Sequence, residues 1–186
     1  GKVWETEIGW LCVYPYFGAD ETNAMYHKTD TKTVEINLPV TQEIEEGYNV
    51  SRSAFIQVGY VSPGDKGLNM ETPCSFLVFN TGDNDIKQVE VSAFEMDKGV
   101  EKKYAIAGWI SVTKTETSGF TEKQGDIGTT IENKITCTYN GGSTFPKGNY
   151  AIAVRPGTPS RLSITVTFSD NGTKTYTTTK MADGTS

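Results

Sequence analysis

Apolar and polar residues alternate along most of this chain. In the stretch TKTVEINLPV, Val34, Ile36 and Leu38 alternate with polar residues, and Val89, Val91 and Ala93 repeat the pattern in IKQVEVSAFEM, which starts at Ile86. A period of two places successive side chains on opposite faces of a β-strand, whereas a helix repeats every 3.6 residues. These two stretches therefore predict strands that are buried on one face.

Most of the remaining chain has the same β-strand character. Strands are predicted within KVWETEIGWLCVYPY, SAFIQVGYV, CSFLVFN, KYAIAGWISVTK, TIENKITCTYN and GNYAIAVRP. The continuous apolar run of CSFLVFN predicts a strand that is covered on both faces. Turn signals recur about every 8–12 residues, which is typical of an all-β antiparallel sandwich.

Helix is nearly absent from this prediction. The segment TQEIEEGYNVS could form at most one helical turn, and Gly47 and the lone Ile44 argue against it. The lack of a long amphipathic helix excludes a parallel α/β fold.

The last predicted element is the hairpin RLSITVTFSDNGTKTYTTT. Leu162, Ile164 and Val166 line one face of its first arm, and Asn171-Gly172 can take the positive φ angles of a tight turn. The return arm, 173–179, is almost entirely threonine, and no further strand pattern follows it before Ser186. We therefore expect the hairpin to lack a strand that covers it.

A linker is predicted at 63–69, PGDKGLN, because glycine, proline and polar residues concentrate there. It divides the chain into an N-terminal β unit, 1–66, and a C-terminal β-sandwich domain, 67–186. The first unit is small for an independent sandwich, so we expect it to be incomplete or to pack on the second.

Charge and cysteine content narrow the classes of function. The net charge is −6 and both signs are interspersed, so no basic stripe suits nucleic acid. No apolar run approaches the roughly 20 residues of a membrane span. Cys12, Cys74 and Cys137 are too far apart in sequence for a metal knuckle. Buried free thiols on strands are the favoured interpretation, with a Cys74–Cys137 disulfide as the alternative.

Catalytic groups are not recognisable in the sequence. The single histidine, His27, lies in a polar stretch and is interpreted as an exposed loop residue. The acidic pairs at Asp83–Asp85 and Asp20–Glu21 lack the spacing of a calcium loop and are interpreted as solvated turns. No nucleophile elbow or phosphate loop is present. We therefore expect no enzyme activity, no metal and no cofactor, which disfavours a hydrolase on a β-sandwich scaffold.

The aromatic segment WETEIGWLCVYPYF suggests an alternative function. Alternation places Trp4, Trp10 and Tyr14 on one strand face with apolar partners, which predicts core positions. Tyr16 and Phe17 follow Pro15 and are freer to be exposed. They are candidate glycan contacts, and the alternative function is that of a glycan-binding surface lipoprotein.

The order of the segments resembles that of the fimbrillin-like proteins, the major and minor fimbrial subunits of Bacteroides and their relatives. WLCVYPY is followed by VEINLPVTQEIEEG, SAFIQVGYV and LNMETPCSFLVFN, then by IKQVEVSAFE, YAIAGWISVT, STFPKGNYAIAVRPG and the final hairpin. The resemblance spans nearly the whole chain and rests on shared order. The usual family pattern is not matched by ETP at 71–73 or by the sequence AVRPGTPS.

The resemblance implies two sandwich domains of transthyretin-like, Greek-key topology in a protein exported to the cell surface, outer membrane or fimbrium. It implies a lipid anchor in the precursor and a non-enzymatic structural or adhesive role as a pilus subunit or accessory component. The expected partners are other fimbrial subunits or host and bacterial surface ligands. Assembly would proceed by β-strand addition, in which an extended segment of one chain fills a groove of the next.

Family members usually continue past the hairpin with one more strand, where this sequence has only MADGTS. We therefore expect a shortened or partly ordered C-terminal form, in which the return arm is an exposed strand edge. The residues of this candidate strand-exchange edge are Thr173, Lys174, Thr175, Tyr176 and Thr177.

Overall fold

The computed structural model describes residues 2–6, 9–14, 26–28, 32–64, 67–114, 120–124 and 132–179. The described chain is all-β, as the alternating pattern predicts. Within these ranges, no helix is long and apolar enough to cross a membrane. The strands are β1 (Lys2–Thr6), β2 (Gly9–Tyr14), β3 (Tyr26–Lys28), β4 (Thr33–Leu38), β5 (Thr41–Ile44), β6 (Gln57–Val61), β7 (Met70–Glu71), β8 (Ser75–Asn80), β9 (Ile86–Asp97), β10 (Val100–Lys103), β11 (Gly108–Lys114), β12 (Phe120–Gln124), β13 (Lys134–Tyr139), β14 (Asn149–Val154), β15 (Arg161–Phe168) and β16 (Thr173–Thr179).

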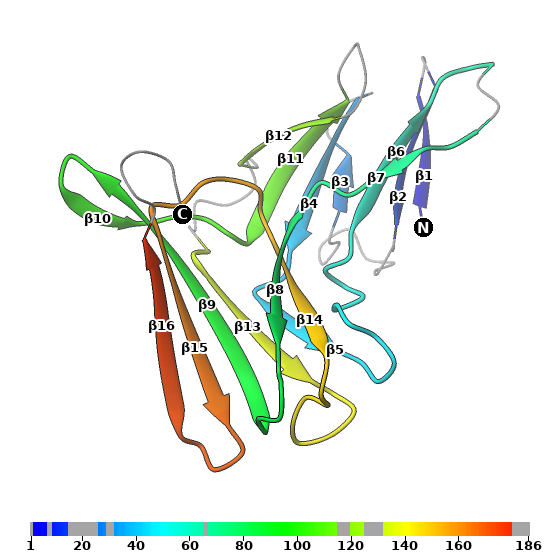
Figure 1. Ribbon diagram of the computed structural model, residues 1–186. Helices are drawn as coiled ribbons and strands as arrows, with labels where there is room; N and C mark the ends of the chain where they lie inside the picture. The colour runs from blue at the N-terminus through cyan, green and yellow to red at the C-terminus, as the bar shows by residue number, and fades with distance from the viewer. Residues whose placement is uncertain are drawn as a thin grey trace.

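Two sheets of four strands form a first sandwich (Figure 1). One sheet has the order β1-β2-β6-β7 and the other β12-β11-β4-β3. Its core contains the predicted apolar face of β4, which interleaves with residues of β2, β6 and β11. The fully buried members are Leu11, Val34, Ile36, Leu38, Ala54, Ile56, Val58, Ile110, Val112 and Ala153, the last of which lies in β14.

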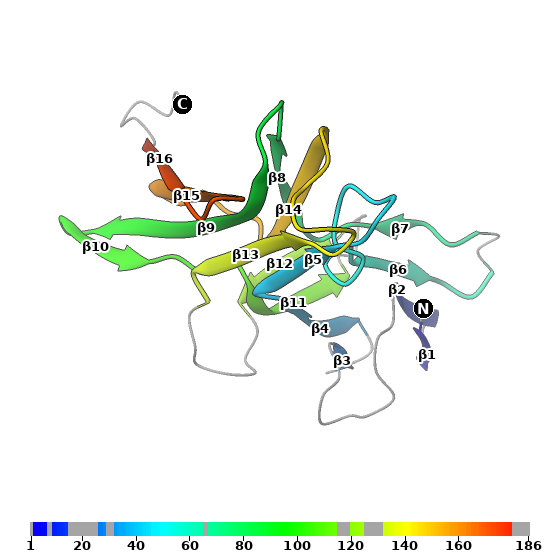
Figure 2. The same ribbon diagram turned by 90° about the horizontal axis from the view of Figure 1, so that it is seen from below.

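A second sandwich has sheets of unequal size. Its larger sheet has the order β16-β15-β9-β13-β5, with β10 paired to β9, and its smaller sheet contains β14 and β8. The predicted apolar face of β9 is buried here, together with Ile135 and Ile152 from β13 and β14. β8 and β14 lie over β9 and β13, so β15 and β16 extend beyond the smaller sheet (Figure 2).

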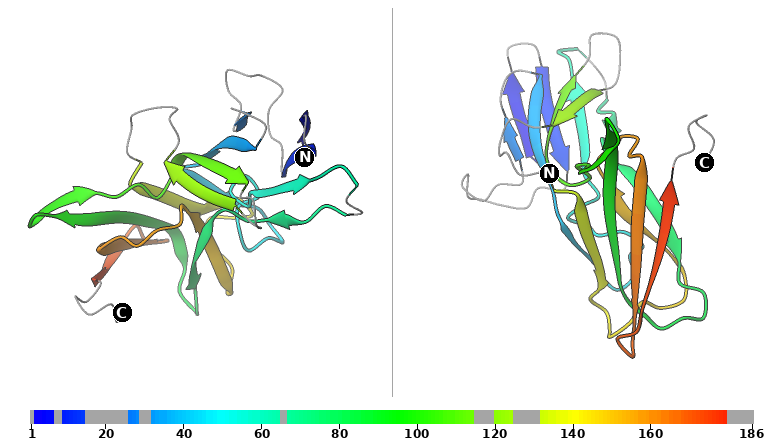
Figure 3. Two further views of the ribbon diagram at one scale, coloured as in Figure 1. Left: turned by 90° about the horizontal axis from the view of Figure 1, so that it is seen from above. Right: turned by 90° about the vertical axis from the view of Figure 1, so that its left-hand side faces the viewer.

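The chain passes repeatedly between the two sandwiches (Figure 3). β4 of the first sandwich is followed by β5 of the second, and β9 and β10 of the second are followed by β11 and β12 of the first. β11 pairs with β4, which joins the predicted segments 1–66 and 67–186 in one sheet. β5 pairs with β13 in parallel and joins them in another. The predicted domain boundary therefore does not coincide with a sheet boundary, and the division of the chain into two domains at this point stays a prediction.

The structure corrects the assignment of the aromatic face of β2. Leu11 and Val13 are buried in the core, whereas Trp10 and Tyr14 are 39% and 50% exposed. Alternation had placed Trp10 and Tyr14 inside, but Leu11 and Val13, on the opposite face of β2, belong to the core of the first sandwich. Cys12 shares the face of Trp10 and Tyr14 and is buried, so the prediction fails for the two aromatic residues.

The segment TQEIEEGYNVS, in which Gly47 and the lone Ile44 argued against a helical turn, contains β5, and Gln42 and Ile44 alternate inward along it. One further prediction is wrong in part. CSFLVFN forms β8, but it is not covered on both faces, since Val78 is 69% exposed.

The turn of the last hairpin agrees with its prediction at Asn171. This residue takes a φ of 64°, in the left-handed region that asparagine tolerates, whereas Gly172 does not need a positive φ. The Gly172 amide donates to Asp170 Oδ1 over 2.8 Å and closes the turn. β16 therefore returns along β15 in the register Ile164–Tyr176 and Val166–Lys174.

Candidate functional site

The smaller sheet of the second sandwich has one closed edge and one open edge. On the β14 side, the Gln42 side chain takes the place of a neighbouring strand. Its Nε2 donates to the Ala153 carbonyl over 2.6 Å, and its Oε1 accepts from the Ala153 amide over 2.9 Å. The Ala151 amide also donates to the Asn49 carbonyl, and Val50 forms a parallel bridge with Ala151. The main-chain groups of this edge are therefore largely satisfied.

The other edge of the smaller sheet is β8. In the described part of the chain, β8 pairs with β14 alone. Every second residue of a paired strand turns its N–H and C=O away from its partner. This edge therefore presents main-chain donors and acceptors to an incoming strand.

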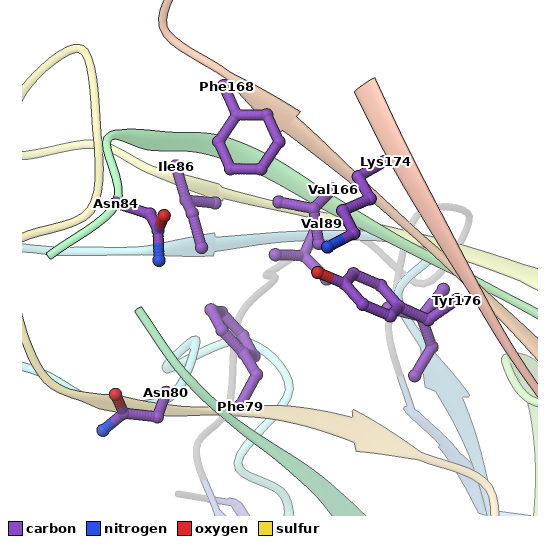
Figure 4. Close-up of a pocket in the computed structure, with 10 residues that line it drawn as sticks. Phe79, Asn80, Asn84, Ile86, Val89, Val166, Phe168, Lys174 and Tyr176 are labelled. Atoms are coloured by element: carbon purple, nitrogen blue, oxygen red, sulfur yellow. The ribbon is translucent and has the colours of Figure 1, made fainter. Parts of the chain in front are cut away.

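A groove runs beside β8, between it and the β15–β16 hairpin (Figure 4). Its volume is about 290 Å³. Phe79 of β8 faces Val166 and Phe168 of β15 across it, with Tyr176 of β16 along one side. The groove is lined by Phe79, Asn80, Asn84, Ile86, Val89, Ile164, Val166, Phe168, Lys174 and Tyr176. The groove thus has an apolar floor and a polar rim.

The wall at Phe79 is part of an aromatic cluster. The ring packs edge-on against Phe145 at 5.5 Å between centroids, and Phe145 packs in turn against Tyr150 at 5.0 Å. Burial, with a smaller contribution from Tyr139, raises the pKa of the Tyr150 phenol. This aromatic cluster fixes β8 from beneath, so its free edge is held in an extended form.

The opposite wall consists of the hairpin that the sequence singled out. Lys174 and Tyr176 share a face with Val166 and Ile164, and they line the groove. The Lys174 ammonium lies 4.9 Å from the centre of the Tyr176 ring. Thr173, Thr175 and Thr177 belong to the other face, where Thr175 and Thr165 share a hydrogen bond of 3.0 Å. The five residues of the candidate edge thus divide into two that line the groove and three that do not.

The other candidate residues are placed as follows. Tyr16 and Phe17, the candidate glycan contacts, lie outside the described residues, as do Asp20 and Glu21. His27 was predicted to lie in a loop. It lies instead in β3, where it is the cross-strand partner of buried Glu35.

The acidic turn and the cysteines carry no recognisable site. Asp83 forms an exposed ion pair with Lys147 at 2.7 Å. Over the described ranges, no three acidic, histidine or cysteine side chains gather as metal ligands would. The three cysteines are buried free thiols, as favoured, although Cys74 precedes β8 instead of lying within it. Burial raises the pKa of Cys137 to about 12.

Sequence reasoning identified one wall of the groove and missed the other. β8 was predicted as a strand covered on both faces, which hid its open edge. The sequence did carry one signal, because β8 has apolar residues on both of its faces. In the structure Phe76 packs on the first core and Leu77 and Phe79 pack on the second, whereas Val78 is exposed to solvent.

Comparison of the chain with protein-family models, with curated proteins and with solved structures found no match.

Proposed function

We propose that this protein is a non-enzymatic surface protein that joins other subunits by β-strand addition, as expected of a fimbrial subunit or accessory component. The observation that carries the proposal is the groove between β8 and the β15–β16 hairpin. It combines an apolar floor with an unpaired strand edge in the described structure. Those are the two features that capture of an extended segment requires.

The occupant that fits is an extended segment of a neighbouring subunit, with apolar residues at alternate positions. Paired with β8, such a segment becomes the third strand of the smaller sheet. Its inward side chains contact Val166 and Tyr176, and its outward side chains stay in solvent. A strand added at the far edge of β16 would extend the larger sheet but would leave Val166 uncovered. The proposal therefore assigns the main-chain pairing to β8 and a side-chain role to β16.

Surface location follows from the same role. The resemblance to fimbrillin-like proteins supports export to the cell surface or a fimbrium, with a lipid anchor in the precursor. The proposal includes no catalytic step and requires no cofactor.

Hydrogen–deuterium exchange tests the proposal directly. Eight-residue peptides are selected from a random display library on the intact protein and then added during exchange. We expect selected peptides to alternate apolar and polar residues, and to protect the amides of β8 more than those of β16. Protection elsewhere, or peptides without alternation, contradicts the proposal.

A matched pair of variants separates groove binding from general effects of charge. Tyr176→Lys places a second cation beside Lys174 inside the groove, whereas Thr175→Lys adds the same charge to the other face of the same strand. We expect the first to weaken peptide binding at least about tenfold, since burial of an unpaired charge is costly, and the second to leave it nearly unchanged. Equal effects of the two variants count against a groove site.

A further inference from the structure

A second hollow lies on the first sandwich, where the end of β2 meets the connection between β5 and β6. Its volume is about 330 Å³, and it is lined by Tyr14, Tyr48, Val50, Arg52 and Phe55. Tyr48 and Phe55 are 46% and 37% exposed, and Tyr14 is exposed as well. Three aromatic rings in solvent around one hollow form a surface suited to contact with a ligand.

The connection that carries these rings is held in place by its own backbone. The Tyr48 amide donates to the Glu45 carbonyl over 3.1 Å, and the Phe55 amide donates to the Ser51 carbonyl over 3.0 Å. Between these turns, the Asn49 carbonyl accepts a hydrogen bond from β14. The backbone that carries Tyr48 and Phe55 is therefore ordered before any ligand arrives, which lowers the entropic cost of binding.

One charged residue, Arg52, lines the hollow, and Glu45 is its ion-pair partner. Arg52 Nη1 lies 3.2 Å from Glu45 Oε2, and the guanidinium carbon lies 5.4 Å from the centre of the Tyr48 ring. The hydrogen bond to Glu45 and its charge raise the pKa of Arg52, with smaller effects from Tyr48 and Tyr14. The Glu45–Arg52 pair offers donors and acceptors together, with no net charge.

This combination selects among ligand classes. An anionic ligand would have to compete with Glu45 for the guanidinium, and a wholly apolar ligand would desolvate the ion pair without replacing its hydrogen bonds. A sugar ring presents an apolar C–H face and a rim of hydroxyls, each of which can both donate and accept. The C–H face matches the aromatic rings, and the hydroxyl rim matches the ion pair.

We propose that this hollow is a binding site for a neutral saccharide, with Tyr48 and Phe55 as stacking surfaces and the Glu45–Arg52 pair as the hydroxyl-binding group. Tyr14 closes the hollow on the β2 side. The site is independent of the strand groove, because the two lie on different sandwiches and share no lining residue. The candidate glycan contacts Tyr16 and Phe17 lie outside the described residues and are not part of this proposal.

The test begins with an array of neutral and anionic oligosaccharides probed with the intact protein, followed by titration calorimetry with the strongest neutral compound. We expect a neutral compound to bind, and Tyr48→Ala and Phe55→Ala each to weaken it about tenfold. Arg52→Met should weaken it similarly, through lost hydrogen bonds. Circular dichroism of each variant checks that the fold is retained.

Tyr176→Ala is the matched control, because Tyr176 is exposed to nearly the same extent as Tyr48 but lies in the strand groove. It should leave saccharide binding unchanged, and Tyr48→Ala should leave peptide capture unchanged, so failure of either proposal is distinguishable from failure of the other. Fluorine-labelled tyrosine provides a readout without a pocket variant: the saccharide should shift the Tyr14 and Tyr48 resonances and not that of Tyr176. Binding of anionic glycans alone, binding of proteins alone, or no binding overturns the proposal.

Discussion

At the scale of single residues, Gln42 shows how a side chain can substitute for a strand. Its amide is fully buried, and it forms two hydrogen bonds with the backbone of Ala153. A primary amide has the same donor and acceptor pair as a peptide group, so it can close the β14 edge where no strand lies beside it. The contrast with β8, whose edge has no such substitute in the described structure, makes β8 the receptive edge.

Replacement of Gln42 by leucine keeps the volume but removes both hydrogen bonds. Because it leaves two buried backbone groups without partners, we expect the free energy of unfolding to fall by about 2–3 kcal/mol. Urea denaturation measures the change. Gln88→Leu, at a partly exposed position of β9, is the control and should change stability by no more than about 0.5 kcal/mol. Equal losses in the two variants would show that the Gln42 amide is not structural.

Cys137 gives a prediction about pH. Desolvation raises its pKa from 9.0 to about 12 in the folded protein. Between these two values the unfolded chain binds fewer protons at this thiol than the folded one, so stability falls as the pH rises through that window. We expect Cys137→Val, which cannot ionise, to lose less stability than the wild type between pH 8 and about pH 10.5 in urea denaturation. An identical loss in both proteins contradicts the predicted burial.

The same thiol should be chemically inert. Because the thiolate is the reactive form, Cys137 should be the slowest of the three cysteines to react with a thiol reagent at pH 8, and all three should react after denaturation.

At the scale of elements, the alternation of apolar residues predicts the strands well and their partners poorly. The apolar residues predicted to be buried in β4 and β9 are buried, and the two arms of the final hairpin pair as predicted, because period-two alternation depends only on neighbouring positions. The prediction that β4 is buried on one face is wrong in part, since Thr33 and Glu35 on its other face are buried too. The parallel pairing of β5 with β13 was not predicted, since it joins residues nearly a hundred positions apart. The aromatic face of β2 was misassigned because size and hydrophobicity do not reveal which face meets the other sheet.

The turn between β15 and β16 positions one wall of the groove, and its conformation is testable. Asn171 has a φ of 64°, which costs other non-glycine residues about 1–2 kcal/mol. Asn171→Ala should therefore reduce the free energy of unfolding by about 1 kcal/mol. Asn171→Gly should stay within about 0.5 kcal/mol of the wild type, since glycine adopts this conformation freely. Both variants lose the exposed hydrogen bond that Lys87 donates to Asn171. The difference between their free energies of unfolding therefore measures the cost of the backbone conformation alone.

At the scale of the whole molecule, the groove results from an imbalance between two sheets. A sheet of six strands faces a sheet of two in the described structure, so the apolar residues of β15 beside β8 are only partly buried. The sequence predicted an uncovered hairpin, because the threonine-rich arm had no apolar neighbour to follow it. It did not predict β8 as the other wall, because that depends on where the smaller sheet ends.

The interleaved path of the chain gives a prediction about cooperativity. β4 pairs with β11, and β5 pairs with β13, so neither sandwich can form completely from 1–66 or from 67–186 alone. We therefore expect the chain to unfold in one transition. All three tryptophans, Trp4, Trp10 and Trp109, lie in strands of the first sandwich, so their fluorescence reports on that part, whereas far-ultraviolet circular dichroism reports on both.

The two signals should have the same urea midpoint, because β11 of the first sandwich directly follows β10 of the second, and its partner β4 is directly followed by β5 of the second. Residues 1–66 expressed alone should remain unfolded, since β4 then lacks its longest-paired neighbour and its apolar face is exposed. Mixing of the two segments should restore the tryptophan signal of the intact protein. Separate midpoints, together with a folded 1–66 segment, would instead establish two autonomous domains divided at the predicted linker.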